Sequence, residues 1–292
     1  MELRNLGSAG LVSSAIGLGT VAFTGTYGPV SRRECIRTIG HALDVGITMV
    51  DTADSYAHGG IERMIGESLS GRRDDALIGT QVGFHRATAG KAPVIDGSPA
   101  YLAAACDASL KRLRTDFIDL LYLASVDPRI PVEESIGKLA ELVKAGKVRY
   151  VGLCAASADD LRRAHAIHPI SALAVSYSLR HRSAEREALS AAAALGVGIV
   201  ACRPLARGLL TGGVAVETSA REREALRAMQ AQAAELDLGV ARLALAWLLA
   251  WRDDVVPVPS TRSLAHLEMD ASASGIRLTR ETCVRLAGLF PP

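Results

Sequence analysis

Short apolar runs alternate with amphipathic stretches along nearly the whole chain, and this alternation limits the possible folds more than any other feature of the sequence. Continuous apolar strands separated by helices are typical of a parallel sheet that is covered on both faces. Eight such strand–helix units favour a closed barrel over an open doubly wound sheet. The predicted strands span residues 15–18, 49–51, 76–80, 118–123, 148–153, 172–175, 198–202 and 255–258.

The beginning of the chain supports the same fold. The first predicted strand is not followed by a Gly-x-Gly-x-x-Gly turn, which weighs against a Rossmann domain. Residues 3–12 are expected to form a small hairpin that turns at Gly7 or Gly10 and closes the bottom of the barrel. We therefore predict an α/β protein, a (β/α)8 TIM barrel with an N-terminal β-hairpin cap, in which residues 1–292 form one domain.

The composition excludes several classes of protein. Hydrophobic residues make up 49% of the 292 residues, so a large core can be buried. A net charge of +2 with scattered Lys and Arg does not favour a nucleic-acid partner. No apolar run approaches the roughly 18 residues of a membrane span, and no signal peptide is recognisable. The cysteines have no Cys-x-x-Cys pair, which favours reduced thiols in the cytoplasm: Cys35, Cys106, Cys154, Cys202 and Cys283.

Four segments, in the expected order, resemble the aldo-keto reductase superfamily. They are Met49-Val-Asp-Thr-Ala-Asp-Ser-Tyr56, Ala145-Gly-Lys-Val-Arg-Tyr-Val-Gly-Leu153, Pro204-Leu-Ala-Arg-Gly-Leu-Leu-Thr-Gly212 and Leu243-Ala-Leu-Ala-Trp-Leu-Leu249. The resemblance implies the barrel fold, a reduced nicotinamide as hydride donor, and catalytic groups at the C-terminal ends of the strands. It also implies that Tyr56 is the proton donor, and that Asp51 is the partner of a Lys that lowers the pKa of this tyrosine.

Two positions depart from the family pattern. Gln81 stands where the family has the Lys, and Ala124 stands where it has a His that orients the substrate carbonyl. A phenol has a pKa near 10 unless a nearby cation lowers it. Losing one positioned donor typically costs on the order of 10²–10³ in rate. These two losses predict that ordinary carbonyl reduction is impaired.

The expected cofactor contacts also depart from the pattern. The polar residues that hold the nicotinamide carboxamide in the family correspond to Cys154, Ala155 and Ala174. Buried amide groups without partners cost about 1–3 kcal/mol each. Tyr177 matches the residue on which the nicotinamide stacks.

The phosphate and adenine contacts are mixed. Arg203 replaces a Ser that touches the pyrophosphate, whereas Arg262 matches a cationic position for the adenosine phosphate. Met269 and Asp270 replace the usual adenine contacts, and the segment from Gly212 to the helix near residue 221 is short. Together these changes predict that nicotinamide binding is lost, with weakened or rearranged NADPH binding as the alternative.

The remaining polar residues have simpler explanations beside the functional ones. His58 could act as a general acid or base because its unperturbed pKa lies near neutrality, but a histidine in such a loop is more often merely exposed. Cys154 could be a nucleophile, although an inert buried thiol is the more common case. Asp51 and Tyr56 could serve only to terminate a strand and to pack under a loop. No cluster of His, Cys and carboxylates has metal-ligand spacing.

These observations leave three functional hypotheses. The favoured one is an enzyme without a cofactor that uses Asp51, Tyr56, Arg203 and His58 for redox-neutral cyclisation, dehydration or isomerisation of a small biosynthetic intermediate. The second is an NADPH-dependent reductase of a small carbonyl or enone substrate, with Gln81 or water in place of the missing groups. The third is a non-catalytic binding or regulatory protein. The partner is a small molecule in the first two cases, and the oligomeric state stays open.

Overall fold

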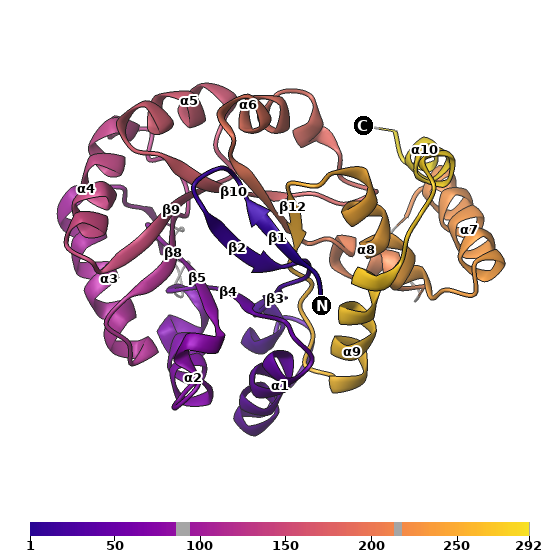
Figure 1. Ribbon diagram of the computed structural model, residues 1–292, viewed down its shortest axis with the longest axis horizontal. Coiled ribbons are helices and arrows are strands. Elements are labelled where there is room, and N and C mark those ends of the chain that lie inside the picture. The colour runs from indigo at the N-terminus through magenta and orange to yellow at the C-terminus, as the bar shows by residue number, and fades with distance from the viewer. Residues whose placement is uncertain (86–93, 213–217, 292) are drawn as a thin grey trace.

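The computed structural model describes residues 1–85, 94–212 and 218–291, and its centre is an eight-stranded parallel sheet (Figure 1). The strands follow the chain in the order β12-β11-β10-β9-β8-β5-β4-β3. Their bounds are β3 Leu18–Gly19, β4 Met49–Ala53, β5 Leu77–Val82, β8 Ile118–Leu123, β9 Val148–Cys154, β10 Ile170–Ser176, β11 Gly198–Cys202 and β12 Val255–Pro257. A short antiparallel pair, β6 Phe84–His85 and β7 Val94–Ile95, follows β5.

Helices surround this sheet as an outer layer (Figure 1). Several begin at a Ser or Thr whose side chain accepts a hydrogen bond from the first turn; these caps are Ser31, Ser98, Ser157, Ser219, Ser263 and Thr279. The helices are α1 Arg32–Asp44, α2 Gly60–Ser68, α3 Pro99–Leu113, α4 Val132–Lys144, α5 Ala158–Ile167, α6 Ala188–Leu195, α7 Ala220–Glu235, α8 Val240–Trp251, α9 Leu264–Ser272 and α10 Arg280–Leu289. The predicted (β/α)8 barrel is confirmed.

The barrel closes between β3 and the last strand. The backbone N–H of Gly17 donates to the carbonyl of Pro257 at 2.9 Å, and that of Gly19 donates to the carbonyl of Pro259 at 2.8 Å. Because proline has no N–H, these residues cannot donate back, and the ladder is one-sided. The strand β3, which pairs with β4 at Leu18 and Gly19, is shorter than the strand predicted for residues 15–18 and overlaps it only at Leu18.

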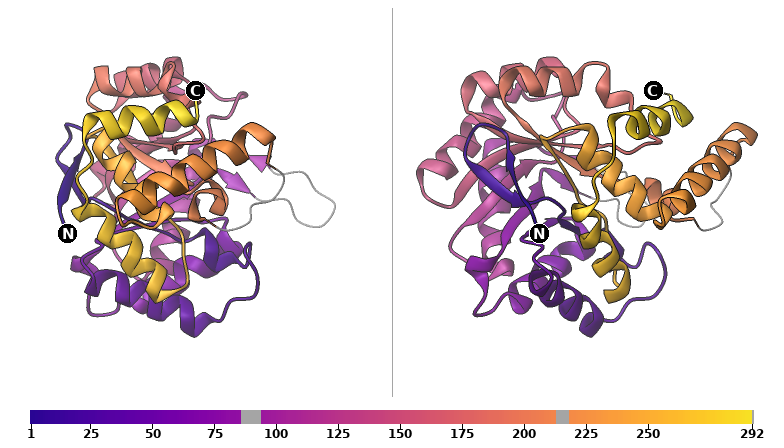
Figure 2. Two further views of the ribbon diagram at one scale, coloured as in Figure 1. Left: turned by 90° about the vertical axis from the view of Figure 1, so that its right-hand side faces the viewer. Right: turned by 45° about the vertical axis from the view of Figure 1, so that its right-hand side comes forward.

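The N-terminal hairpin covers one end of the barrel, as predicted. Strands β1 (Leu3–Leu6) and β2 (Leu11–Ser14) pair through a turn at residues 7–10. Leu6 and Leu11 are buried in the apolar cluster inside the barrel. The Ser8 N–H donates to the Gly196 carbonyl at 2.7 Å, and a Cβ at Gly7 would stand 2.5 Å from that oxygen. The left view of Figure 2 shows the hairpin and the β6–β7 pair on opposite sides of the molecule.

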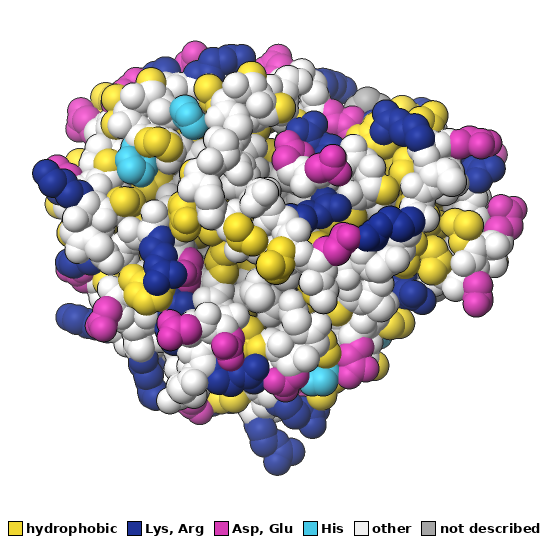
Figure 3. Space-filling view, in the orientation of Figure 1, with side chains coloured by type: hydrophobic (Ala, Val, Ile, Leu, Met, Phe, Trp, Pro, Cys, Tyr) yellow, Lys and Arg dark blue, Asp and Glu magenta, His cyan; other side chains and the backbone are white. Residues whose placement is uncertain are grey.

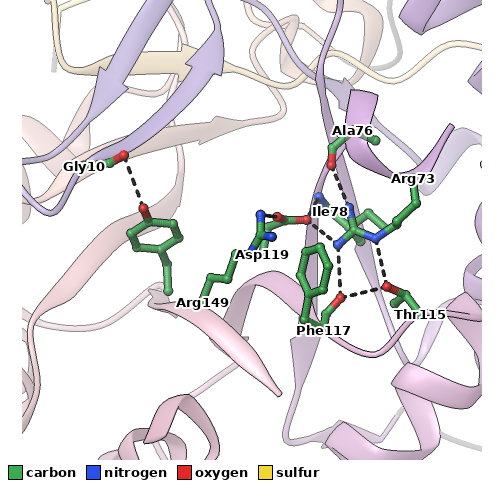
Figure 4. Close-up of polar contacts among 9 residues, drawn as sticks. Gly10, Arg73, Ala76, Ile78, Thr115, Phe117, Asp119 and Arg149 are labelled. Carbon is green, nitrogen blue, oxygen red and sulfur yellow. Dashed lines mark hydrogen bonds and ion pairs between the residues drawn. The ribbon is translucent and has the colours of Figure 1, made fainter. Parts of the chain in front are cut away.

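A charged cluster ties three strands together at their N-terminal ends, on the hairpin side (Figure 4). Asp119 accepts hydrogen bonds from Arg73 at 2.6 Å, from Arg149 at 3.1 Å and from the Ile78 N–H at 2.9 Å. The ring of Phe117 contacts both guanidinium groups, whose central carbons lie 4.3 Å and 3.7 Å from its centroid. These contacts join β5, β8 and β9 at the end opposite to the predicted site.

Charges are dispersed on the face that carries the hairpin. Figure 3 shows Lys and Arg interspersed with Asp and Glu over this face, with no large area of one sign. Within the described residues, no helix is long and apolar enough to cross a membrane.

Candidate active site

A cavity of about 620 Å³ opens at the C-terminal ends of the barrel strands. This is the end at which barrel enzymes place their catalytic groups. The structure brings together eight of the residues singled out in the sequence, all of which line this cavity: Asp51, Tyr56, Gln81, Cys154, Ala155, Ala174, Arg203 and Arg262. Ala124, His58 and Tyr177 are not part of its lining.

Asp51, on β4, is the charged group deepest in this site. Its side chain is 5% exposed, and its Oδ2 atom is buried without a hydrogen-bond partner in the described structure. Burial raises the pKa of Asp51 to about 7, and no neighbouring charge contributes to this shift. The carboxyl group therefore titrates near neutral pH.

Three neutral side chains face Asp51 inside the barrel. Tyr122 on β8 is fully buried, and its hydroxyl also lacks a hydrogen-bond partner among the described residues. Cys154 ends β9 and Cys202 ends β11, and burial raises the pKa of both thiols and of the Tyr122 phenol. Because a nucleophilic cysteine needs a lowered pKa, Cys154 is better described as a neutral wall of the site than as a nucleophile.

Tyr56 follows β4 on a short, strained loop. It begins the 3-10 turn η2 (Tyr56–Gly59), in which Ala57 and His58 have φ values of 48° and 52°. Residues with side chains rarely adopt this left-handed conformation, and such strain is often found beside functional sites. The loop holds the partly buried Tyr56 in the cavity wall and turns His58 outward, where it is exposed. The structure thus places His58 away from the other predicted catalytic residues.

Gln81 and Ala124 occupy the positions where the family pattern has cationic or donor side chains. Gln81, on β5, lines the cavity with a half-buried side chain. Ala124 follows β8, and its N–H donates to the Val82 carbonyl at 2.8 Å. Since neither side chain carries a positive charge, Asp51 has no cationic partner from either position.

Tyr177 does not form a surface of the cavity, which corrects the expectation that it is a stacking platform. Its ring is 0% exposed and lies 6.2 Å from that of Trp247, centroid to centroid. Its hydroxyl donates to Glu185 Oε1 at 2.6 Å. Ala172 and Ala174 of β10 belong to the apolar cluster inside the barrel, whereas Leu173, Val175 and Tyr177 belong to the outer cluster, so strand alternation points Tyr177 towards the helices.

Arg203 and Arg262 both line the cavity, but they are held differently. Arg203 has a φ of 53° and is exposed, and no ion pair joins it to Asp51 within the described residues. Arg203 therefore does not neutralise Asp51 in this structure. The Arg262 guanidinium donates to the backbone carbonyls of Gly28 at 2.8 Å, Tyr27 at 3.1 Å and Pro29.

The structure adds polar residues that the sequence analysis did not select. Ser260, Thr261, Ser263 and His266 continue the cavity wall beyond β12 to the start of α9. A helix N-terminus with exposed N–H groups is a favourable place for phosphate. Asp270 lies further along α9, is 5% exposed and has its pKa raised to about 7 by burial. Residues 213–217 of the short segment after Gly212 lie outside the described residues.

Sequence and structure comparisons agree on the family. The Aldo/keto reductase family matches residues 15–289. The chain belongs to this family. "Probable aldo-keto reductase 1" of Glycine max is 37% identical over 296 residues, covering 94% of this chain and 85% of that protein.

Solved structures of other aldo-keto reductases superpose closely. The holo form of AKR11C1 from Bacillus halodurans has a TM-score of 0.88 and 29% identity, covering 100% of this chain and 97% of that one. An aldo-keto reductase from Klebsiella pneumoniae in complex with NADPH has a TM-score of 0.83 and 25% identity, covering 100% of this chain and 96% of that one.

These findings overturn the favoured functional hypothesis. Relatives with the same fold are named reductases, and one structural neighbour holds NADPH. The expectation of a redox-neutral enzyme is therefore wrong, and the expectation of no cofactor is not supported. These expectations relied on single positions such as Ala155 and Ala174. A dinucleotide makes many contacts, so the loss of a few side-chain contacts does not abolish its binding.

Proposed function

We propose that this protein is an NADPH-dependent reductase of a small, largely apolar substrate. The observation that carries this proposal is the cavity, which joins Tyr56 and Asp51 at its inner end to Arg262 and the start of α9 at its outer end. An acid in one part and an anion site in another are what a dinucleotide-dependent reductase needs.

The outer part of the cavity fits a phosphorylated cofactor. Ser260, Thr261 and Ser263 offer hydroxyl donors, and Arg203, Arg207 and Arg262 offer positive charge. The N-terminus of α9, capped by Ser263, adds backbone N–H groups. These groups would hold the phosphates of NADPH, which supplies a hydride when it is bound.

The inner part of the cavity provides the groups that would act on the substrate. Tyr56 can donate its hydroxyl proton, and the Gln81 amide can donate a hydrogen bond to a substrate oxygen or to Tyr56. The apolar wall formed by Val21, Ala22, Ala174 and Val258 would exclude water from a small substrate.

The test begins with the binding of NADPH, measured by calorimetry, followed by its oxidation with a panel of aldehydes, ketones and imines. We expect micromolar affinity, and we expect Tyr56→Phe to lower kcat for carbonyl substrates by about 10² while leaving this affinity unchanged. Tyr150→Phe is the matched control, because the Tyr150 hydroxyl bonds to the Gly10 carbonyl at the other end of the barrel. Lack of NADPH binding even at about 1 mM would overturn the proposal.

A further inference from the structure

The charge of the inner cavity does not suit the reduction of a carbonyl group. When hydride adds to a carbonyl, negative charge develops on the oxygen, and positioned donors or cations stabilise it. Here Gln81 and Ala124 stand at the two positions that would supply them, so neither brings a cation and only Gln81 can donate a neutral hydrogen bond. The buried charged group is the carboxylate of Asp51. A carboxylate would repel a developing alkoxide.

Among the described residues, Asp51 also has no cationic partner that would neutralise its carboxylate. Its Oδ2 atom accepts no hydrogen bond within the described structure, and burial alone accounts for its raised pKa. Tyr122, Cys154 and Cys202 around it stay neutral at physiological pH because burial raises each of their pKa values. The arginines of the cavity act elsewhere: Arg203 and Arg207 are exposed, and Arg262 holds backbone carbonyls.

A buried carboxylate without a partner is costly, so its retention calls for a ligand that compensates it. Such a ligand must be a cation, small enough to reach the inner end of the cavity, and reducible by a hydride. A positively charged carbon–nitrogen double bond meets all three conditions, because its charge lies on the group that is reduced.

We propose that the natural substrate is an iminium ion or a protonated imine, which Asp51 holds by its charge and which is reduced to an amine. This inference rests on the NADPH dependence proposed above and names the substrate class. Hydride adds to the carbon and forms the new C–H bond, while the π-electron pair of the C=N bond becomes the nitrogen lone pair. NADPH is oxidised to NADP⁺ and the substrate is reduced, with no proton needed for an iminium ion.

The same arrangement accepts a neutral imine. Because the Asp51 carboxyl group titrates near pH 7, a fraction of it is protonated and can transfer its proton to the imine nitrogen. The resulting ion pair of carboxylate and iminium then undergoes the same reduction. The missing Lys and His are not needed for this chemistry, since no oxyanion forms.

The first test is binding without cofactor, using the N-methyl-dihydroisoquinolinium cation as the probe and calorimetry as the readout. We expect Asp51→Asn to weaken its binding at least tenfold. The matched control is Asp54→Asn, because the half-buried Asp54 also has a pKa raised to about 7 but accepts a hydrogen bond from Tyr101 and does not line the cavity. We expect the control to bind the cation within about twofold of the unchanged protein. Equal binding by all three proteins would overturn the inference.

The pH dependence of this binding supplies an independent readout. The probe carries a permanent charge, so only the protein titrates. Affinity should rise with pH through about 7 as Asp51 ionises, and this rise should persist in Asp54→Asn and vanish in Asp51→Asn. A rise that survives in Asp51→Asn would also overturn the inference.

The second test is turnover with NADPH. We expect kcat/KM for the cation to exceed that for tetralone, a neutral ketone of similar size, by about 10² or more, and Asp51→Asn to remove most of this preference. Reduction of tetralone but not of the cation would refute the iminium substrate and leave the proposed reductase function intact. Absence of NADPH binding would refute the reductase function, whatever the cation binding shows.

Discussion

The carboxylate of Asp51 and the ring of Tyr122 border the same space beside Gly79. A Cβ at Gly79 would stand 3.4 Å from Asp51 Oδ2 and 3.1 Å from Tyr122 Cε2. Both the Oδ2 atom and the Tyr122 hydroxyl are buried without a hydrogen-bond partner within the described residues. Buried polar groups are nearly always hydrogen-bonded in folded proteins. The unpaired Asp51 and Tyr122 groups therefore indicate a functional site rather than a stabilising contact.

Asp51→Asn should stabilise the protein in a pH-dependent manner. The pKa of Asp51 is about 7 in the folded state and close to its ordinary value of about 4 when unfolded, so ionisation opposes folding. The stability held below pH 4 is lost as pH rises through 7, and the substitution should regain up to about 4 kcal/mol above pH 7 and almost none below pH 4. Denaturant unfolding of both proteins across this range measures the difference. A constant difference at every pH would show that Asp51 is not the titrating group.

Gln81→Lys combined with Ala124→His should shift the substrate preference from iminium cations to carbonyl compounds. A Lys beside Asp51 would neutralise the carboxylate, and both new side chains can donate to a developing oxyanion. We expect kcat for simple aldehydes to rise by about 10² and affinity for the permanent cation to fall at least tenfold. Parallel assays with benzaldehyde and the dihydroisoquinolinium cation measure both changes. If the affinity for the cation stays the same, Asp51 is not what binds it.

Asp119→Asn should weaken folding without changing the site. This residue joins Arg73, Arg149 and the Ile78 N–H at the opposite end of the barrel (Figure 4), and the substitution removes the negative charge that pairs with the two guanidinium groups. We expect a loss of about 3 kcal/mol in the free energy of unfolding. NADPH affinity, measured below the unfolding transition, should stay within twofold. A large loss of affinity would mean that the two ends of the barrel are coupled.

The fold could be predicted from the sequence because its determinants are local and repeated. Apolar runs mark the strands, and side-chain caps such as Ser31 and Ser219 mark helix starts. The short β3 could not be predicted from its own residues, since its bounds depend on which of them pair with β4. Two-residue alternation along the strands would have assigned Tyr177 to the outer face and Tyr122 to the interior.

The function could not be predicted with the same success, because it depends on charged side chains that are distant in the sequence and come close together only in the folded protein. The family resemblance implied that Gln81 and Ala124 stand in place of a Lys and a His. It did not show that the Oδ2 atom of Asp51 would be buried without a partner among the described residues, or that Arg203 would be exposed. Counting lost contacts predicted loss of the cofactor, whereas the shape and lining of the cavity support its retention.

Arg262→Ala should separate the two roles that this side chain can have. Its guanidinium donates to the carbonyls of Tyr27 and Gly28, so it shapes the loop after β3, and it also lines the outer cavity where the cofactor phosphates are proposed to bind. If it contacts the adenosine phosphate, removing it should weaken NADPH about tenfold or more and NADH, which lacks that phosphate, much less. If it only shapes the loop, the affinities for both cofactors should fall equally.

Calorimetry with both nucleotides distinguishes these cases. Arg277→Ala is the control, because Arg277 pairs with Glu2, whereas the cavity opens at the other end of the barrel. We expect the unequal loss, because the carbonyl contacts leave the guanidinium in the cavity wall and no ion pair within the described structure neutralises it.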